Sequence, residues 1–358
     1  MLYNSKSDWT ASQSKSIMLF GMSGLGKTYI SELLRNNGDW FHYSVDYRIG
    51  TRYMGEHIAD NFKKEAMSNP FLANLLQTDA IYISANMKFS DLSPLSSYLG
   101  KPGDPSKGGI PFKEYLRRQR LHRDAETNAM LDTVHFIQRA KSLYDYDKFV
   151  CDTSGSIVEI VDCNDKNDNV MKTLSQYVLP VWIEGTEEHT EELVKRFIKS
   201  PKPMYYNEKF LIECWDNFLK EKSISESKVD PNEFIIWGYR KLLENRSPRY
   251  RKIAKDWGIT LKASDVATVR SEDEFMIDLH TKRPHLTIPE WSVEDIEADE
   301  SKIGLSGSPT KVKSVSSIVL TANESKVLTD SDSDIEGMIK ELIKHQNYRF
   351  TAINNIIL

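Results

Sequence analysis

Short apolar runs alternate with longer amphipathic stretches along most of the chain. Four runs rich in branched and aromatic residues predict buried strands at 17–20, 41–45, 148–152 and 178–184. Weaker runs predict short strands at 80–84 and 258–261. Between these runs, apolar positions repeat with helical spacing and predict helices at 29–37, 56–78, 112–121, 187–199, 207–221, 232–245, 249–256 and 272–279. Alternating strands and helices indicate an α/β fold whose parallel sheet is covered on both faces.

The pattern also divides the chain into a domain and an extension. Strand and helix signals fill residues 1–285, whereas 286–358 is largely irregular and its central part is rich in Ser, Asp, Glu, Lys and Thr. Only 336–345 in the extension predicts a short helix. Within the domain, prolines and glycines predict a long loop at 99–111. A proline-stiffened cationic segment opens a predicted lid at about 199–230.

Composition limits the classes of partner. The chain has 358 residues with 47 Lys and Arg against 52 Asp and Glu, a formal charge of −5, so no broad basic surface for nucleic acid or acidic membranes is expected. Three scattered cysteines form neither a disulfide framework nor a zinc site. Residues 1–16 lack an apolar targeting core, and no stretch reaches the ~20 apolar residues that cross a bilayer. We therefore expect a cytoplasmic protein.

The sharpest chemical signal is the run Gly21-Met22-Ser23-Gly24-Leu25-Gly26-Lys27-Thr28, which lies between the first predicted strand and the first predicted helix. Glycines let backbone N–H groups turn toward a polyphosphate, and the helix N-terminus adds positive potential. Lys27 is expected to reach the β- and γ-phosphates, and the Thr28 hydroxyl to hold Mg²⁺. The sequence thus predicts a phosphate loop that binds ATP with Mg²⁺.

Two acidic residues follow predicted strands. Asp46 ends the second strand and Asp152 ends the third, at the sheet edge where ligands of parallel α/β folds bind. Asp46 is a candidate functional group or a helix cap. Asp152 is a candidate Mg²⁺ ligand through water, or the cap of the following helix.

The order of these features resembles the shikimate kinase and gluconate kinase branch of phosphate-loop small-molecule kinases. Beyond the loop, the resemblance rests on Phe112-Lys113, Ser154-Gly155-Ser156, Lys202-Pro203-Met204 and the Tyr-Arg…Arg-x-Pro-x-Tyr pattern of 239–250. It covers about 15–282 and implies a three-layer α/β/α kinase fold.

The resemblance also implies roles for individual residues. Asp46 matches the acid that receives the acceptor hydroxyl, Arg246 an arginine that binds the acceptor carboxylate, and Lys202 the lid cation near the phosphates. Lys113 and Gly155 match acceptor-binding positions. The chain departs from the family at Ser44, where the family has a second acid; this makes Asp152 its candidate replacement. The altered glycine triplet and the Lys113 substitution argue against shikimate itself as the acceptor.

The extension resembles a different family. Residues 288–296 and the run Gly-x-x-Gly-Ser-Pro-Thr-Lys-Val at 304–312 are similar to the C-terminal arm of the electron transfer flavoprotein β subunit. The flavin-binding body of that subunit is absent, so no flavin site is implied. In that family the arm lies along a partner subunit, which implies either a docking role for the extension or a fused fragment without one.

Together these patterns predict an ATP-dependent kinase of a small polar metabolite, or an ATPase. Positioning and charge stabilisation would supply most of its catalysis, with Lys27, Asp46 and Lys202 as catalytic residues. The alternative is a nucleotide-dependent switch or interaction protein that hydrolyses ATP slowly and signals by rearrangement.

Overall fold

The computed structural model describes residues 6–37, 39–89 and 91–281. Contacts within the chain separate Met1–Ile288 from Pro289–Leu358, and all of the described residues belong to the first unit. The flavoprotein-like arm and the helix expected at 336–345 lie outside the described residues.

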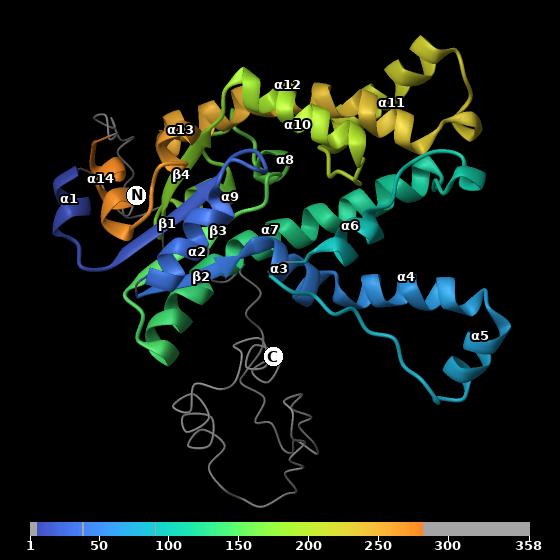
Figure 1. The fold of residues 1–358 in the computed structure, drawn as a ribbon, viewed down its shortest axis with the longest axis horizontal. Coiled ribbons are helices and arrows are strands. Elements are labelled where there is room, and N and C mark those ends of the chain that lie inside the picture. Colours follow the sequence, from blue (N-terminus) through green and yellow to red (C-terminus); the bar gives the residue numbers. More distant parts are fainter. Residues whose placement is uncertain (1–5, 38, 90, 282–358) are drawn as a thin grey trace, which may run out of the picture. The chain divides into compact units, whose positions relative to one another are not determined.

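A parallel sheet of five strands forms the centre of the described chain (Figure 1). Its strand order is β2-β3-β1-β4-β5, with bounds β1 Lys15–Phe20, β2 Trp40–Ser44, β3 Lys148–Asp152, β4 Leu179–Glu184 and β5 Ile259–Lys262. The predicted parallel α/β sheet is confirmed. The prediction of a strand at 80–84 is wrong. These residues form no strand, and none of them is buried.

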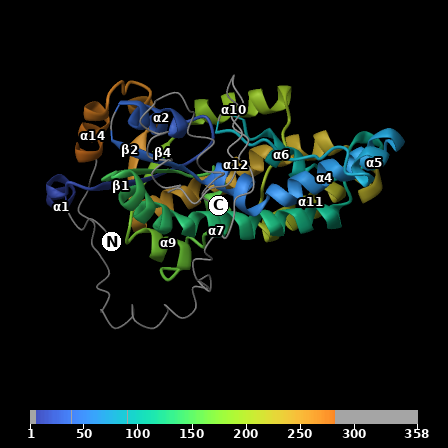
Figure 2. The same ribbon diagram turned by 90° about the horizontal axis from the view of Figure 1, so that it is seen from below.

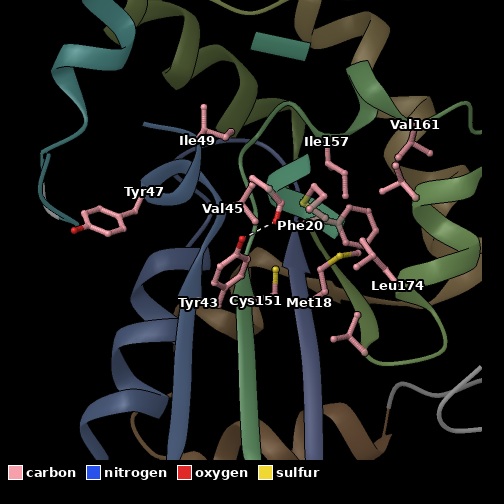
Figure 3. Packing of buried hydrophobic residues seen from close by; sticks show 14 of the residues in the cluster. Met18, Phe20, Tyr43, Val45, Tyr47, Ile49, Cys151, Ile157, Val161 and Leu174 are labelled. Carbon is pink, nitrogen blue, oxygen red and sulfur yellow. Dashed lines mark hydrogen bonds between the residues drawn. The ribbon is translucent and has the colours of Figure 1, made fainter. Parts of the chain in front are cut away.

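Alternate residues of β1 face opposite layers of helices. Met18 and Phe20 pack on one face with α7 Phe112–Tyr144, α8 Ile157–Ile160, α9 Asn169–Leu174 and the end of α12 Pro231–Trp257, and Figure 3 shows part of this cluster. Ile17 and Leu19 pack on the other face with α1 Lys6–Ala11, α2 Lys27–Asn37, α13 Ala263–Val266 and α14 Glu272–Thr281. Burial on both faces explains why the strands are continuous apolar runs.

A separate helical layer lies beside the sheet. It joins the first turns of α7 and α12 to α10 Glu187–Lys199 and α11 Glu208–Lys222. The Phe112 and Trp215 rings stack at 4.4 Å, and Tyr115 Oη and Gln119 Nε2 both donate to the Met204 carbonyl. The predicted lid, 199–230, is therefore a packed part of the fold in this structure.

The connections on either side of the central strand position the site. The chain leaves β1 toward β2 on one side, whereas it leaves the neighbouring β4 toward β5 on the other side. Where connections diverge in this way, the helices leave a crevice at the carboxyl ends of the strands, and ligands bind there. The glycine-rich segment between β1 and α2, residues 21–26, lies at that edge.

The predicted helices are largely present but differ in extent. The helix expected at 56–78 is two helices, α4 Gly55–Met67 and α5 Pro70–Gln77, because Asn69 caps the second and Pro70 begins it. These helices extend away from the sheet in both views (Figures 1 and 2). The remaining short elements are α3 Val45–Arg48, the π-helix Ile49–Tyr53, α6 Ser93–Leu99 and the 3₁₀ turns Pro105–Lys107 and Glu226–Lys228. None of the described helices has the length and apolar character needed to span a membrane.

Helix α12 contradicts the prediction of a break near Pro248, since it runs without interruption from Pro231 to Trp257. Phe234 and Leu243 are buried before the proline, and Tyr250 and Ile253 after it. Burial on both sides of Pro248 outweighs the backbone hydrogen bond that the proline cannot donate.

We predict that Pro248→Ala stabilises the protein by about 1–3 kcal/mol, because alanine restores the missing backbone donor at this exposed helical position. Thermal unfolding measures the effect. The matched control is Pro70→Ala, since Pro70 occupies the first turn of α5, where no intrahelical donor is needed, and should change stability little. A lower melting temperature for Pro248→Ala would show that the helix depends on its proline.

Candidate functional site

A pocket of about 340 Å³ lies at the carboxyl edge of the sheet. Its walls come from the glycine-rich segment, the start of α2, the ends of β2 and β3, and the segment before α6. The lining residues are Ser23, Gly24, Gly26, Lys27, Thr28, Tyr29, Glu32, His42, Ser44, Asp46, Phe89, Leu92, Asp152, Thr153 and Gly155. The structure therefore brings together Lys27, Asp46, Asp152 and Gly155, which the sequence had named from distant parts of the chain.

The glycine-rich segment forms a tight turn in which glycines adopt positive φ angles. Gly24 and Gly26 have φ of 80° and 100°, values that side-chain-bearing residues rarely adopt. Between them, Leu25 is buried in the core and anchors the segment to the sheet. Gly21 and Ser23 complete the turn, and Ser23 lines the pocket.

Lys27 begins α2 and is 7% exposed. Its Nζ donates to the carbonyl oxygens of Gly21 and Met22, each at 2.9 Å. Burial lowers the pKa of Lys27, while nearby Asp152 and Asp46 oppose that shift. The ammonium is thus held at the pocket by the segment it follows.

Thr28 and Asp152 meet directly. Thr28 Oγ1 donates to Asp152 Oδ2 at 3.0 Å, across 124 positions of sequence. Asp152 does not cap the following helix, because the N-cap residue of α8 is Ser156. The hydroxyl and carboxylate predicted to hold a metal ion are therefore adjacent.

Asp46 lies in the first turn of α3 rather than at a strand end. Ser44 caps that helix by accepting from Tyr47 N, so Asp46 is not the cap, and the serine that replaces the family's second acid has a structural role. The pKa of Asp46 is raised to about 6, mainly by burial and also by Asp152, while Lys27 opposes the shift. The buried Lys27 ammonium thus interacts with two carboxyl groups, those of Asp46 and Asp152.

Sequence reasoning missed His42, whose side chain is 3% exposed and lines the pocket. Its Nε2 lies 3.8 Å from Asp152 Oδ2, and neither ring nitrogen has a hydrogen-bond partner among the described residues. A buried imidazole without partners is costly, so this ring is suited to a polar ligand or water in the pocket. The only sequence signal was a polar residue inside an apolar strand.

Buried hydrogen bonds hold the turn after β3 in place. Ser154 Oγ and Ser156 Oγ both donate to Glu126, a fully buried residue of α7. A Cβ on Gly155 would lie 3.1 Å from Ser23 Oγ, so glycine permits close approach to the glycine-rich segment. Burial raises the pKa of Glu126 to about 8. Sequence reasoning missed Glu126, since one acid in a polar helix gives no local signal.

Arg246 is not placed where the resemblance implied. It is 4% exposed and lies outside the pocket lining. Its Nε donates to Glu159 Oε1 at 2.6 Å, and its other two nitrogens donate to the carbonyl oxygens of Gly155 and Tyr205. The guanidinium therefore supports the Gly155 turn instead of facing an acceptor, which corrects its predicted binding role.

Two other predicted site residues also lie outside this pocket. Lys113 is exposed at the start of α7 and does not line the pocket. Lys202 lines a neighbouring pocket instead, beside Leu92, which contributes to both. The expectation that Lys202 sits near the phosphates does not match its position here.

A second recess of about 360 Å³ adjoins the other side of the glycine-rich segment. Gly24, Gly26 and Tyr29 line both spaces. Its remaining wall is mainly apolar, with His189 and Arg270 as polar groups: Leu25, His189, Ala263, Val266, Ala267 and Arg270. A polar pocket and a more apolar recess thus lie on either side of one backbone turn.

The pocket contains oxygen atoms that could bind a metal ion. The described residues contain no cluster of three or more His, Cys, Asp or Glu side chains arranged for a metal ion. The Thr28 hydroxyl and the Asp152 carboxyl are nevertheless hard oxygen donors of the kind that Mg²⁺ prefers. These donors fit a Mg²⁺ ion that takes its remaining ligands from water and phosphate, and a cation would also offset the repulsion from Asp152 that adds to the effect of burial on the Asp46 pKa.

Comparison with protein-family models gives no match for this chain. A search of curated proteins finds none that is significantly similar to it.

The raised pKa of Asp46 leads to a stability prediction. In the unfolded chain this carboxyl ionises near pH 3.8, whereas in the fold it ionises near 6, so folding is penalised by the charged form above pH 6 and the penalty disappears as pH falls toward 3.8. Asp46→Asn should therefore raise stability at pH 8 by up to about 3 kcal/mol and give no gain near pH 4. Denaturant unfolding at both pH values is the measurement. An equal effect at the two pH values would contradict the raised pKa.

Proposed function

We propose that this chain is an ATP-dependent phosphotransferase or ATPase. The phosphates of ATP would bind, together with Mg²⁺, in the pocket of about 340 Å³ beside the glycine-rich segment. The observation that carries the proposal is the Thr28–Asp152 hydrogen bond of 3.0 Å beside a buried Lys27. It unites a helix N-terminus, an ammonium and a metal-suited carboxylate at the edge of a parallel sheet.

The glycine-rich segment and α2 supply the anion-binding groups. Backbone N–H groups at the start of an eleven-residue helix point toward a bound anion, and the helix macrodipole favours negative charge there. Lys27 Nζ exchanges its two carbonyl contacts for phosphate oxygens, which are stronger acceptors. The Thr28 hydroxyl and the Asp152 carboxylate would hold Mg²⁺, which would supply positive charge to balance the phosphates.

The adjoining recess suits the nucleoside. It opens from the same glycines that would hold the phosphates, and its Ala263 and Val266 side chains provide an apolar surface for a flat heterocycle. Arg270 and Tyr29 stand at this recess, with Arg270 Nη1 3.4 Å from Tyr29 Oη. The two spaces together match a ligand with an anionic tail and a largely apolar head.

Asp46 is the group best suited to act on an attacking hydroxyl. Its pKa of about 6 leaves it ionised at neutral pH yet close enough to neutrality to accept a proton. It lines the same pocket as Lys27 and Thr28. The attacking hydroxyl belongs either to a small polar metabolite or to water.

One observation favours the second candidate, a nucleotide-dependent switch that hydrolyses ATP slowly. Arg246, the group expected to bind an acceptor carboxylate, is occupied by Glu159 and backbone carbonyls. Because Arg246 is occupied, Asp46 and His42 are the main polar groups of the pocket that are left to contact an acceptor.

We predict that Lys27→Ala weakens binding of Mg·ATP about tenfold or more, because it removes a buried charge-assisted contact to the phosphates. Titration calorimetry measures the affinity. Arg35→Ala, an exposed change on the same helix, is the matched control and should bind normally. Equal affinities for all three proteins would refute the nucleotide site.

A second prediction distinguishes the enzyme from the switch. Asp46→Asn preserves shape but removes the base, so a phosphotransferase should lose about 10²-fold or more in turnover while its ATP affinity changes little. ADP release at saturating ATP, with and without candidate acceptors, is the assay. Turnover that is unchanged in the variant would assign Asp46 no chemical role and favour the switch.

A further inference from the structure

The long loop predicted at 99–111 is a folded structure with a defined position. Gly103 N donates to the Ile110 carbonyl and Ile110 N to the Lys101 carbonyl, which closes the loop on itself. Asp104 N donates to the Val229 carbonyl and ties the loop to the start of α12. Added Cβ atoms at Gly103 and Gly109 would lie 2.6 Å from backbone atoms, so both glycines are required by close packing. Loops built this tightly in a compact domain usually have a function.

This loop forms one wall of a pocket of about 620 Å³. The opposite walls are α6, the first residues of α12 and the proline-stiffened segment 201–203. Three lysines, Lys101, Lys107 and Lys202, line it against a single acid, Asp91. The lining thus has more basic than acidic side chains, and the Asp230 carboxylate, which is not part of the lining, pairs with Lys107.

The lysines are positioned by polar neighbours. Lys101 Nζ donates to Asn232 Oδ1 at 2.7 Å, and burial lowers the pKa of Lys101. Lys107 Nζ lies 3.4 Å from Asp230 Oδ2, the cap of α12. Lys202 is exposed and comes from the opposite wall. Lysines from two separate segments thus line one pocket, an arrangement that suits an oxyanion ligand.

The pocket lies next to the phosphate pocket. Leu92 lines both, so the two pockets adjoin at this residue. A ligand long enough to pass Leu92 would occupy both pockets, one lined by Asp46 and the other by the lysines. The three lysines supply the cationic groups for binding an anion that Arg246 does not provide.

We propose that the lysine pocket binds the oxyanion, a phosphate ester or a carboxylate, of the small molecule that receives the phosphoryl group. The assignment of this ligand as acceptor rests on the proposed function, whereas the anion site rests on its own geometry. In the transfer, an acceptor hydroxyl forms a bond to the γ-phosphorus and its proton passes to Asp46. The bond from that phosphorus to the β–γ bridging oxygen breaks, and the electron pair leaves with ADP.

The test uses matched sugar probes and the full-length chain. Calorimetry is performed with the phosphate loop saturated by Mg²⁺ and a non-hydrolysable ATP analogue, so that a probe phosphate cannot bind there. Glucose 6-phosphate and glucuronate present the two anion types, and glucose is the neutral control. We expect glucose 6-phosphate or glucuronate to bind and glucose not to bind, and the stronger probe identifies the anion type.

The variants locate the binding. The double variant Lys107→Ser/Lys202→Ser should weaken probe binding about 100-fold, since each ammonium contributes about tenfold. Lys107→Arg/Lys202→Arg should retain binding, and Lys220→Ser, an exposed change on α11, is the control. Thermal unfolding confirms that each variant is folded. Failure of both anionic probes to bind at 20 mM, or equal binding by the serine double variant, would overturn the site.

The outcomes separate this inference from the proposed function. If the ATP analogue does not bind but a probe still binds in a manner that depends on Lys107 and Lys202, the anion site stands and the nucleotide function fails. If Lys27→Ala abolishes probe binding while the serine double variant binds normally, the probe occupies the glycine-rich segment and the inference is overturned. Binding sensitive only to the Lys107 and Lys202 changes supports it.

Discussion

Two carboxyl groups and one ammonium lie together at the carboxyl edge of the sheet, where Lys27 and Asp152 are buried. Asp46 and Asp152 repel each other, and Lys27 compensates for only one of them. A triphosphate would add more negative charge to this group, so binding it requires a further cation. The adjacent oxygen donors of Thr28 and Asp152 provide the place for one. Charge balance is thus the constraint that would link a bound nucleotide and its metal ion to this edge of the sheet.

The fold maintains that charge arrangement through buried polar contacts beneath the pocket. Glu126 holds Ser154 and Ser156, while Arg246 and Tyr250 donate to the Gly155 carbonyl. Arg246 is itself paired with the buried Glu159. Removing one member of such a network leaves its partner buried without compensation, which is far more costly than losing an exposed pair. The network fixes the turn that approaches the glycine-rich segment and explains why α12 lies close against the sheet.

The sequence predicted the parts of this structure that have local signals. Strands buried on both faces appear as apolar runs, and the glycine-rich segment follows one of them, so β1 and α2 were predicted correctly. The phosphate- and metal-binding roles of Lys27 and Thr28 stay predictions. Asp152 ends β3 at the carboxyl edge of the sheet, whereas Asp46 lies in the first turn of α3, and both line the pocket. Their chemical roles stay predictions. His42 and Glu126 were missed, since their importance comes from burial against residues distant in the chain. Two expectations were wrong for the same reason, the helix break at Pro248 and the acceptor-binding role of Arg246. Tertiary packing determines both features, and residues nearby in the sequence carry no sign of it.

The most direct test of the central claim is a crystal structure of the protein with Mg²⁺ and a non-hydrolysable ATP analogue. The account predicts β- and γ-phosphates within the turn of residues 21–26, Lys27 Nζ on the phosphates, and Mg²⁺ held beside Thr28 and Asp152. It also predicts the base in the recess formed by Leu25, Ala263 and Val266. Phosphates bound at another surface, or a pocket that stays without nucleotide at saturating concentration, would contradict it.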